Sequence, residues 1–148
     1  MNRGSRAIPF LFIVFLVMMF VTGGYTASNE EYYELQEKCC KRADEVFKHE
    51  YGNGQSSDEH FVVMSSYKSQ YNRKFRRCFI LITTAYTAKD NRKTGSIMKD
   101  LWDITKHKAY GVFIGYDKSS TPNQCEVLGK YCKSQSEWDS LTSQFINE

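Results

Sequence analysis

The sequence lacks the short motifs that usually identify an enzyme. Neither G-x-S-x-G nor H-E-x-x-H occurs among its 148 residues, so neither a serine-hydrolase elbow nor a zinc-protease helix is indicated. There is also no Cys-x-x-Cys, and none of the five cysteines lies close to a histidine in the sequence. A zinc site is therefore not expected, and no other metal or cofactor is indicated.

The chain also has little excess charge of either sign. Its 20 Lys and Arg residues face 17 Asp and Glu residues, and removal of Arg3 and Arg6 with the leader described below leaves 18 against 17. Four cations alternate with aromatic residues around residues 73–77, a composition that can bind nucleic acid. A nearly neutral domain offers polyanions no general attraction, so nucleic acid is not an expected partner.

The N-terminus has the composition of a secretory signal. Two arginines precede an apolar run over residues 7–21, and small residues follow it. The run is shorter than the ~20 residues that a membrane span needs, although an uncleaved anchor remains the alternative. We predict a signal peptide over 1–24 and one exported domain over 25–148, periplasmic or secreted, with no membrane span after cleavage.

Hydrophobic periodicity predicts two helices with strands between them. Apolar residues repeat at helical spacing within 28–50, and Ser134–Glu137 matches the S-x-x-E capping box of a second helix. The segments expected to form strands are 61–71, 78–86, 97–104, 109–116 and part of 125–131. This order predicts an α+β fold, with the N-terminal and C-terminal helices covering one face of an antiparallel sheet of about four to five strands.

Five cysteines in an oxidising compartment predict two disulfides and one free thiol. Cys39 lies on the apolar stripe of the first helix and Cys78 opens the strand expected to be central, so a helix across the sheet would join them. Cys125 and Cys132 can face each other across a short hairpin. Cys40 is rotated about 100° from the apolar stripe and is the expected free thiol.

Four segments of the sequence resemble a known family. LQEKC at 35–39, YNRKFRRCF at 71–79, LWDITKHKAYGVF at 101–113 and CEVLGKYCKSQSEWDSL at 125–141 are similar to a family of small exported bacterial proteins of unassigned function. The resemblance implies that four cysteines belong to the family pattern and that Cys40 is additional. It implies no activity.

Two carboxylates flank a tryptophan, a composition found in sugar-cleaving sites. Asp100 and Asp103 stand on either side of Trp102. On a strand, residues three apart point to opposite faces, so these two cannot form a local acid/base pair. No catalytic residue is predicted.

The hairpin between 97–104 and 109–116 has two possible registers. Only a loop over Lys106–Lys108 places apolar residues opposite one another, pairing Ile104 with Tyr110 and Trp102 with Val112. These four residues are expected to share one face and to pack under a helix.

The opposite face of that hairpin would carry Leu101 opposite Phe113. If this face is open to water, Leu101 and Phe113 form an exposed apolar pair. They are then the expected ligand contact.

The abundance of tyrosine is the remaining functional signal, because tyrosine supplies rigid amphipathic contact area at interfaces. We predict an exported protein that acts by binding a protein or a glycan rather than by catalysis. The alternative is a small hydrolase whose residues converge only in three dimensions. A cleft with two or more converging titratable groups would favour the hydrolase, and a flat exposed aromatic patch would favour binding.

Overall fold

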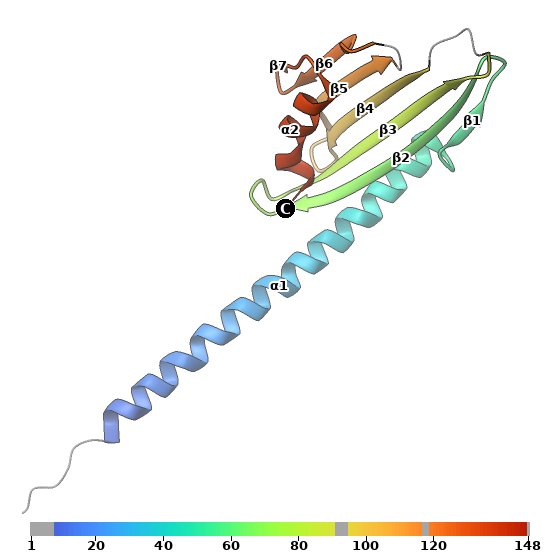
Figure 1. The fold of residues 1–148 in the computed structure, drawn as a ribbon. Coiled ribbons are helices and arrows are strands. Elements are labelled where there is room, and N and C mark those ends of the chain that lie inside the picture. Colours follow the sequence, from blue (N-terminus) through green and yellow to red (C-terminus); the bar gives the residue numbers. More distant parts are fainter. Residues whose placement is uncertain (1–7, 91–94, 117–118, 148) are drawn as a thin grey trace, which may run out of the picture. The chain divides into compact units, whose positions relative to one another are not determined.

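The computed structural model of this chain describes residues 8–90, 95–116 and 119–147, with side chains from Asn29 onward. A long helix precedes the sheet and a short one follows it (Figure 1). The elements are α1 (Ile8–Tyr51), β1 (Gln55–Ser57), β2 (Phe61–Asn72), β3 (Arg77–Ala88), β4 (Ser96–Asp103), β5 (Lys108–Tyr116), β6 (Gln124–Val127), β7 (Lys130–Tyr131) and α2 (Gln135–Ile146). The chain divides after Leu35 into two units, and the second, from Gln36 onward, contains the sheet and both apolar clusters.

The first helix begins earlier than predicted. It runs from Ile8 rather than from the expected start near residue 28, because the apolar segment continues the helix without a break. The predicted signal peptide lies outside the side chains that the structure describes. Among the side chains from Asn29 onward, no helix is both long enough and apolar enough to cross a membrane.

The sheet is antiparallel, and each strand pairs with the next one along the chain, from β1 to β7. The α+β prediction is confirmed, but the sheet has seven strands rather than four to five. The sequence pattern missed β1 because all three of its residues are exposed. Gly54 makes this pairing possible: at φ +78°, a Cβ there would lie 2.4 Å from the Ser65 carbonyl oxygen.

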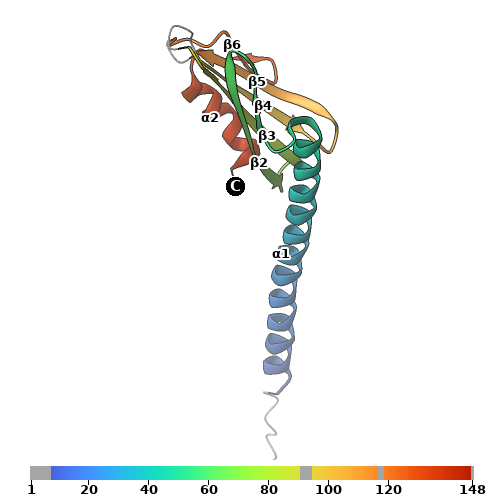
Figure 2. The same ribbon diagram turned by 90° about the vertical axis from the view of Figure 1, so that its right-hand side faces the viewer.

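The two helices lie on opposite faces of the sheet rather than on one (Figure 2). On β3, Phe79 belongs to the apolar cluster beneath α2, whereas Ile80 belongs to the cluster beneath the C-terminal part of α1. Alternate residues of a strand point to opposite faces, so a strand that is apolar on both faces needs a cover on each. We call these surfaces the α2 face and the α1 face.

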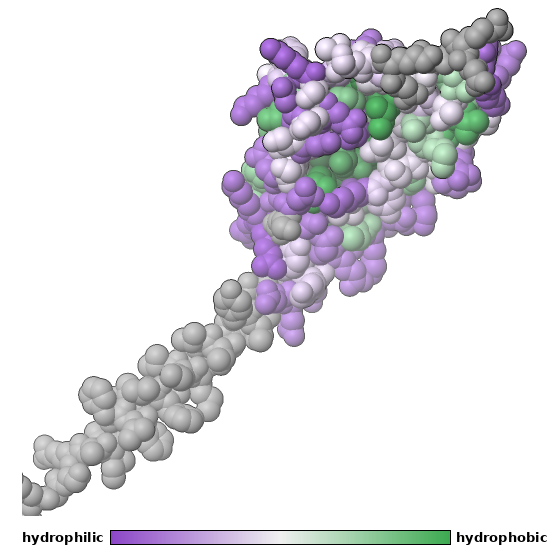
Figure 3. All heavy atoms as spheres, viewed as in Figure 1, coloured by the Kyte–Doolittle hydropathy of each residue, from purple (hydrophilic) through white to green (hydrophobic). Residues whose placement is uncertain are grey.

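The α2 face holds the larger core. The predicted capping box forms, with Ser134 Oγ accepting from the Glu137 backbone N–H at 3.2 Å. Trp138 and Phe145 are fully buried beneath the helix, and Phe145 packs 5.1 Å from Phe79 between ring centroids. Figure 3 views this face, where apolar patches lie among polar side chains.

The β4–β5 hairpin adopts neither the predicted loop nor the predicted register. Asp103 pairs with Lys108 and Asp100 with Val112, with a bulge that leaves Tyr110 unpaired. The cause is the Asp103 carboxylate, whose Oδ1 accepts the backbone N–H groups of Thr105 and Lys106 at 2.9 and 3.1 Å and so fixes the turn earlier.

The different register changes which side chains are exposed. Leu101 and Phe113, the expected ligand contact, are 0% and 4% exposed in the core of the α2 face, so that expectation is wrong. Trp102, expected to pack under a helix with Tyr110, lies on the other face and is 40% exposed. The reason is the bulge, which brings Tyr110 onto the α2 face without Trp102.

Candidate functional site

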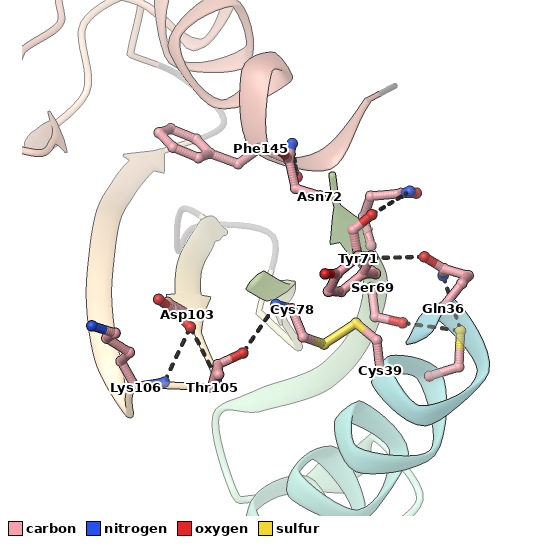
Figure 4. The surroundings of a disulfide bond; sticks show 12 residues. Gln36, Cys39, Ser69, Tyr71, Asn72, Cys78, Asp103, Thr105, Lys106 and Phe145 are labelled. Carbon is pink, nitrogen blue, oxygen red and sulfur yellow. Dashed lines mark hydrogen bonds between the residues drawn. A yellow bond between two sulfur atoms is a disulfide. The ribbon is translucent and has the colours of Figure 1, made fainter. Parts of the chain in front are cut away.

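The two expected disulfides are present, and one of them fixes α1 to the sheet. Cys39 is bonded to Cys78 and Cys125 to Cys132. Cys39, Ala43 and Phe47 are buried at successive turns of α1, so the disulfide secures a helix that already packs on β3 (Figure 4). The tether sets the position of the last turns of α1 over the α1 face.

A cleft of about 750 Å³ opens where α1 leaves the sheet uncovered. The cluster beneath α1 takes its sheet residues mainly from β2 and β3, so much of β4 on this face lies beside the helix rather than beneath it. The cleft is lined by Glu45, Val46, His49, Glu50 and Tyr51 of α1, Ile80 and Ile82 of β3, Asp100 and Trp102 of β4, and Ile104 and His107 of the following turn.

The floor of the cleft is apolar except for one carboxylate. Asp100 pairs across the sheet with Ile82 on one side and Val112 on the other, and Trp102 is its neighbour along the strand on the same face. Burial raises the pKa of Asp100 above its usual value. Within the part of the chain that the structure describes, this carboxylate has neither a hydrogen bond nor an ion pair.

Tyr51 contributes the second perturbed group of the cleft. Burial raises the pKa of its phenol, and the nearby charge of Asp100 raises it further. The Tyr51 ring stacks on Phe47, with centroids 5.2 Å apart and planes 15° from parallel. The ring is therefore held in place by the helix core while its edge borders the cleft.

Two hydrogen-bonded pairs border the cleft at its ends. Arg42 Nη2 lies 3.1 Å from His107 Nε2 and can only donate, so the histidine nitrogen accepts and links α1 to the β4–β5 turn. His49 Nδ1 donates to Glu50 Oε1 at 2.8 Å on the exposed side of the helix. Both pairs are exposed, so they define the rim rather than a buried catalytic array.

The other residues noted in the sequence lie elsewhere. Cys40 is reduced and exposed, and its Sγ accepts from Gln36 Nε2 at 3.2 Å and from Ser69 Oγ at 3.7 Å. Asp103 is fully buried on the α2 face, opposite in direction to Asp100, as the strand pattern predicts. Among the described residues, no three His, Cys, Asp or Glu side chains gather to hold a metal ion.

The cleft could have been suspected from one signal in the sequence. Asp100 interrupts the apolar positions on its face of a strand, and aspartate is depleted in strands. Whether Asp100 lies near Glu45, Glu50 and the two histidines depends on where α1 crosses the sheet. Local sequence patterns do not contain that information.

No protein-family model, no curated protein and no solved structure matches this chain.

Proposed function

We propose that this chain is an exported, disulfide-stabilised binding protein whose ligand occupies the cleft between α1 and strands β3 and β4. The observation that carries the proposal is the cleft itself, about 750 Å³ with an apolar floor and one carboxylate that has no partner among the described residues. Ligand sites in proteins are commonly clefts of ~300–1,000 Å³ with apolar walls and few polar groups.

The hydrogen bonding in the cleft favours binding over catalysis. A nucleophile needs a base within hydrogen-bond reach, and that base is usually oriented by a third group. The two described pairs, Arg42–His107 and His49–Glu50, do not include Asp100. The half-buried Asp100 carboxylate therefore belongs to neither hydrogen-bonded pair, although its charge raises the pKa of the Tyr51 phenol.

A ligand screen by two-dimensional amide NMR tests this proposal. Binding of a small molecule to the mature, oxidised protein is expected to shift the amide signals of Ile82, Asp100 and Trp102. Val46→Trp fills the cleft and should abolish binding. Val62→Trp places the same side chain at an exposed position on the α2 face and should leave binding intact. Equal binding by both variants would contradict the proposal.

A hydrolase is the second candidate, and one observation favours it. Several titratable groups converge on the cleft, and burial raises the pKa of Asp100, as a general acid requires. Turnover of chromogenic glycosides or esters by the wild type, lost in Asp100→Asn, would support the hydrolase. Equal turnover by both proteins would exclude a role for Asp100.

Export is proposed from the composition of residues 1–24 and from the resemblance to small exported bacterial proteins. The two disulfides fit an oxidising compartment. The intact mass of the protein recovered from an expressing bacterium should correspond to cleavage near Gly24. A mass that retains the apolar run of residues 7–21 would instead establish an anchored protein.

A further inference from the structure

Asp100 is a half-buried carboxylate in apolar surroundings, and a cation bound in the cleft would lower the cost of that position. Its cross-strand neighbours Ile82 and Val112 are apolar, and so are Met98 and Trp102, which flank it along β4 on the same face. A half-buried carboxylate without a hydrogen bond loses hydration and gains nothing in return. Within the described residues no cation is paired with Asp100, so a cationic ligand would find an unoccupied charge partner here.

The walls beside Asp100 suit an apolar body attached to that cation. Ile82 and Ile104 are buried in the floor, and the indole of Trp102 is 40% exposed beside them. Tyr51 borders the same space, close enough to Asp100 for the carboxylate charge to raise the pKa of its phenol. Aromatic rings next to a carboxylate are the recurring surroundings of bound organic ammonium groups, because the ring face attracts positive charge.

The charges around the cleft favour a cation over an anion. From α1, Glu45 and Glu50 face it together with His49, and from the β4–β5 turn His107 faces it while accepting from Arg42. A neighbouring hollow over β5 and β6 also borders Asp100 and adds Glu126 and Lys108. The Lys108 ammonium lies 5.9 Å from the Tyr110 ring centroid, and among the described residues it forms no ion pair with Asp100.

We propose that the cleft binds an organic ammonium ion with an apolar body, its charge against the Asp100 carboxylate and its apolar part on Ile82 and Trp102. This inference rests on the proposed binding function and specifies the chemical class of the ligand. An anionic ligand of the same shape would meet three carboxylates, those of Glu45, Glu50 and Asp100. Charge is therefore what distinguishes the true ligand class.

Matched probes of opposite charge test the proposal by calorimetry on the mature, oxidised protein. Phenethylamine should bind, and 3-phenylpropanoate, which has a similar apolar body and a carboxylate, should not. Asp100→Asn should weaken phenethylamine binding about tenfold or more, the scale of a lost charge-assisted hydrogen bond. Glu59→Gln removes one exposed negative charge outside the cleft and should leave the affinity unchanged.

A pH series on the wild type provides a test that needs no variant. Only the ionised form of Asp100 attracts the amine, so phenethylamine affinity should rise as the pH rises through the titration of this carboxyl group. An affinity that is flat from pH 3 to pH 7, or that falls over this interval, would overturn the assignment of Asp100. So would equal binding of amine and acid, or full affinity in Asp100→Asn.

Different results would overturn the cleft as a binding site and the ammonium ion as its ligand. Binding of neutral or anionic compounds that is lost in Val46→Trp would keep the cleft as a binding site and overturn the ammonium ligand. No binding of any probe in the screen would overturn both. A blocked lysine dipeptide serves as a further probe: binding of the dipeptide without phenethylamine would keep the ammonium chemistry and identify a protein side chain as its source.

Discussion

The two faces of the sheet differ in how fully a helix covers their apolar side chains. On the α2 face, Phe79, Phe145 and Trp138 are 0%, 1% and 0% exposed, so the helix covers a well-buried aromatic core. On the α1 face, the helix is tethered over β2 and β3 and leaves Trp102 and Asp100 beside an open cleft.

The contrast is sharpest between two aspartates of one strand. Asp103 points to the α2 face and is buried, with its oxygens accepting from two turn amides and from Arg77 Nη1 at 3.2 Å. Asp100 points to the α1 face and has no such partner among the described residues. Asp103 therefore stabilises the turn of the hairpin, whereas Asp100 makes no such contribution among the described residues.

The largest loss of stability is expected from a substitution in the core of the α2 face. Phe145 contacts the rings of Phe75, Phe79 and Tyr110, so Phe145→Ala should cost about 3–5 kcal/mol of unfolding free energy. The matched change Trp102→Ala on the open face should cost about 1 kcal/mol, as for a partly exposed site. Urea denaturation measures both, and equal costs would remove the distinction between the faces.

The second-largest loss of stability is expected on removal of the disulfide that fixes α1 over the α1 face. Cys39→Ser with Cys78→Ser opens a loop of 39 residues' separation, which the chain-entropy relation values at about 4 kcal/mol. Loss of the shorter Cys125–Cys132 loop should cost less, about 2.5 kcal/mol. Cys40→Ser is the control and should leave the melting temperature unchanged. Peptide mapping that finds Cys40 bridged to Cys78 would refute the assignment.

The third-largest loss of stability is expected on removal of the Asp103 carboxylate. Asp103→Ala leaves the half-buried Arg77 guanidinium without its carboxylate and removes the acceptor of two turn N–H groups. We expect a cost of about 3 kcal/mol, measured by chemical denaturation. A much smaller cost would mean that the turn holds the hairpin without this side chain.

Asp100→Asn should raise the free energy of unfolding, whereas the preceding substitutions should lower it. Burial raises the pKa of Asp100 in the folded state, so the folded protein binds this proton more readily than the unfolded chain does. The stability gained from that proton is complete below the unfolded value near 3.8 and is lost as pH rises through the higher folded pKa. The variant should therefore be more stable than the wild type at pH 7, and the difference should vanish near pH 3.

The smallest expected effect concerns the buried indole of the closed face. Trp138 Nε1 is buried and has no hydrogen-bond partner among the described residues. Trp138→Phe loses packing but removes an unsatisfied donor, so the net change should stay within about 1 kcal/mol. Thermal melting checks this, and a loss well beyond that value would contradict the idea that removing the unsatisfied donor offsets the lost packing.

The sequence predicted those parts of the fold that depend on local pattern. The capping box at Ser134 began α2 as expected, and the apolar run after Cys78 formed a strand buried on both faces. The consequence of that second observation was missed: a strand apolar on both faces requires helices on both faces, not one.

The site depended on information that local patterns do not contain. The register of β4 and β5 was predicted from apolar pairing, but the Asp103 side chain fixed the turn by accepting backbone N–H groups. This placed Leu101 in the core and turned Trp102 outward. The cleft arises because α1 crosses at β2 and β3, a tertiary position that no spacing along the chain specifies.

The strands follow one another in the sheet in the same order as along the chain, and this order affects how the protein folds. Every strand pairs with its immediate successor, so the sheet can grow one hairpin at a time with short loop closures, the situation that favours rapid folding. The contact of Asn72 Nδ2 with the carbonyl oxygens of Gln144 and Phe145 joins the β2–β3 turn to the end of α2. These partners are 72 and 73 positions apart in the sequence, so docking of α2 closes a far longer loop than a single hairpin does, and we expect it to be slower than hairpin formation.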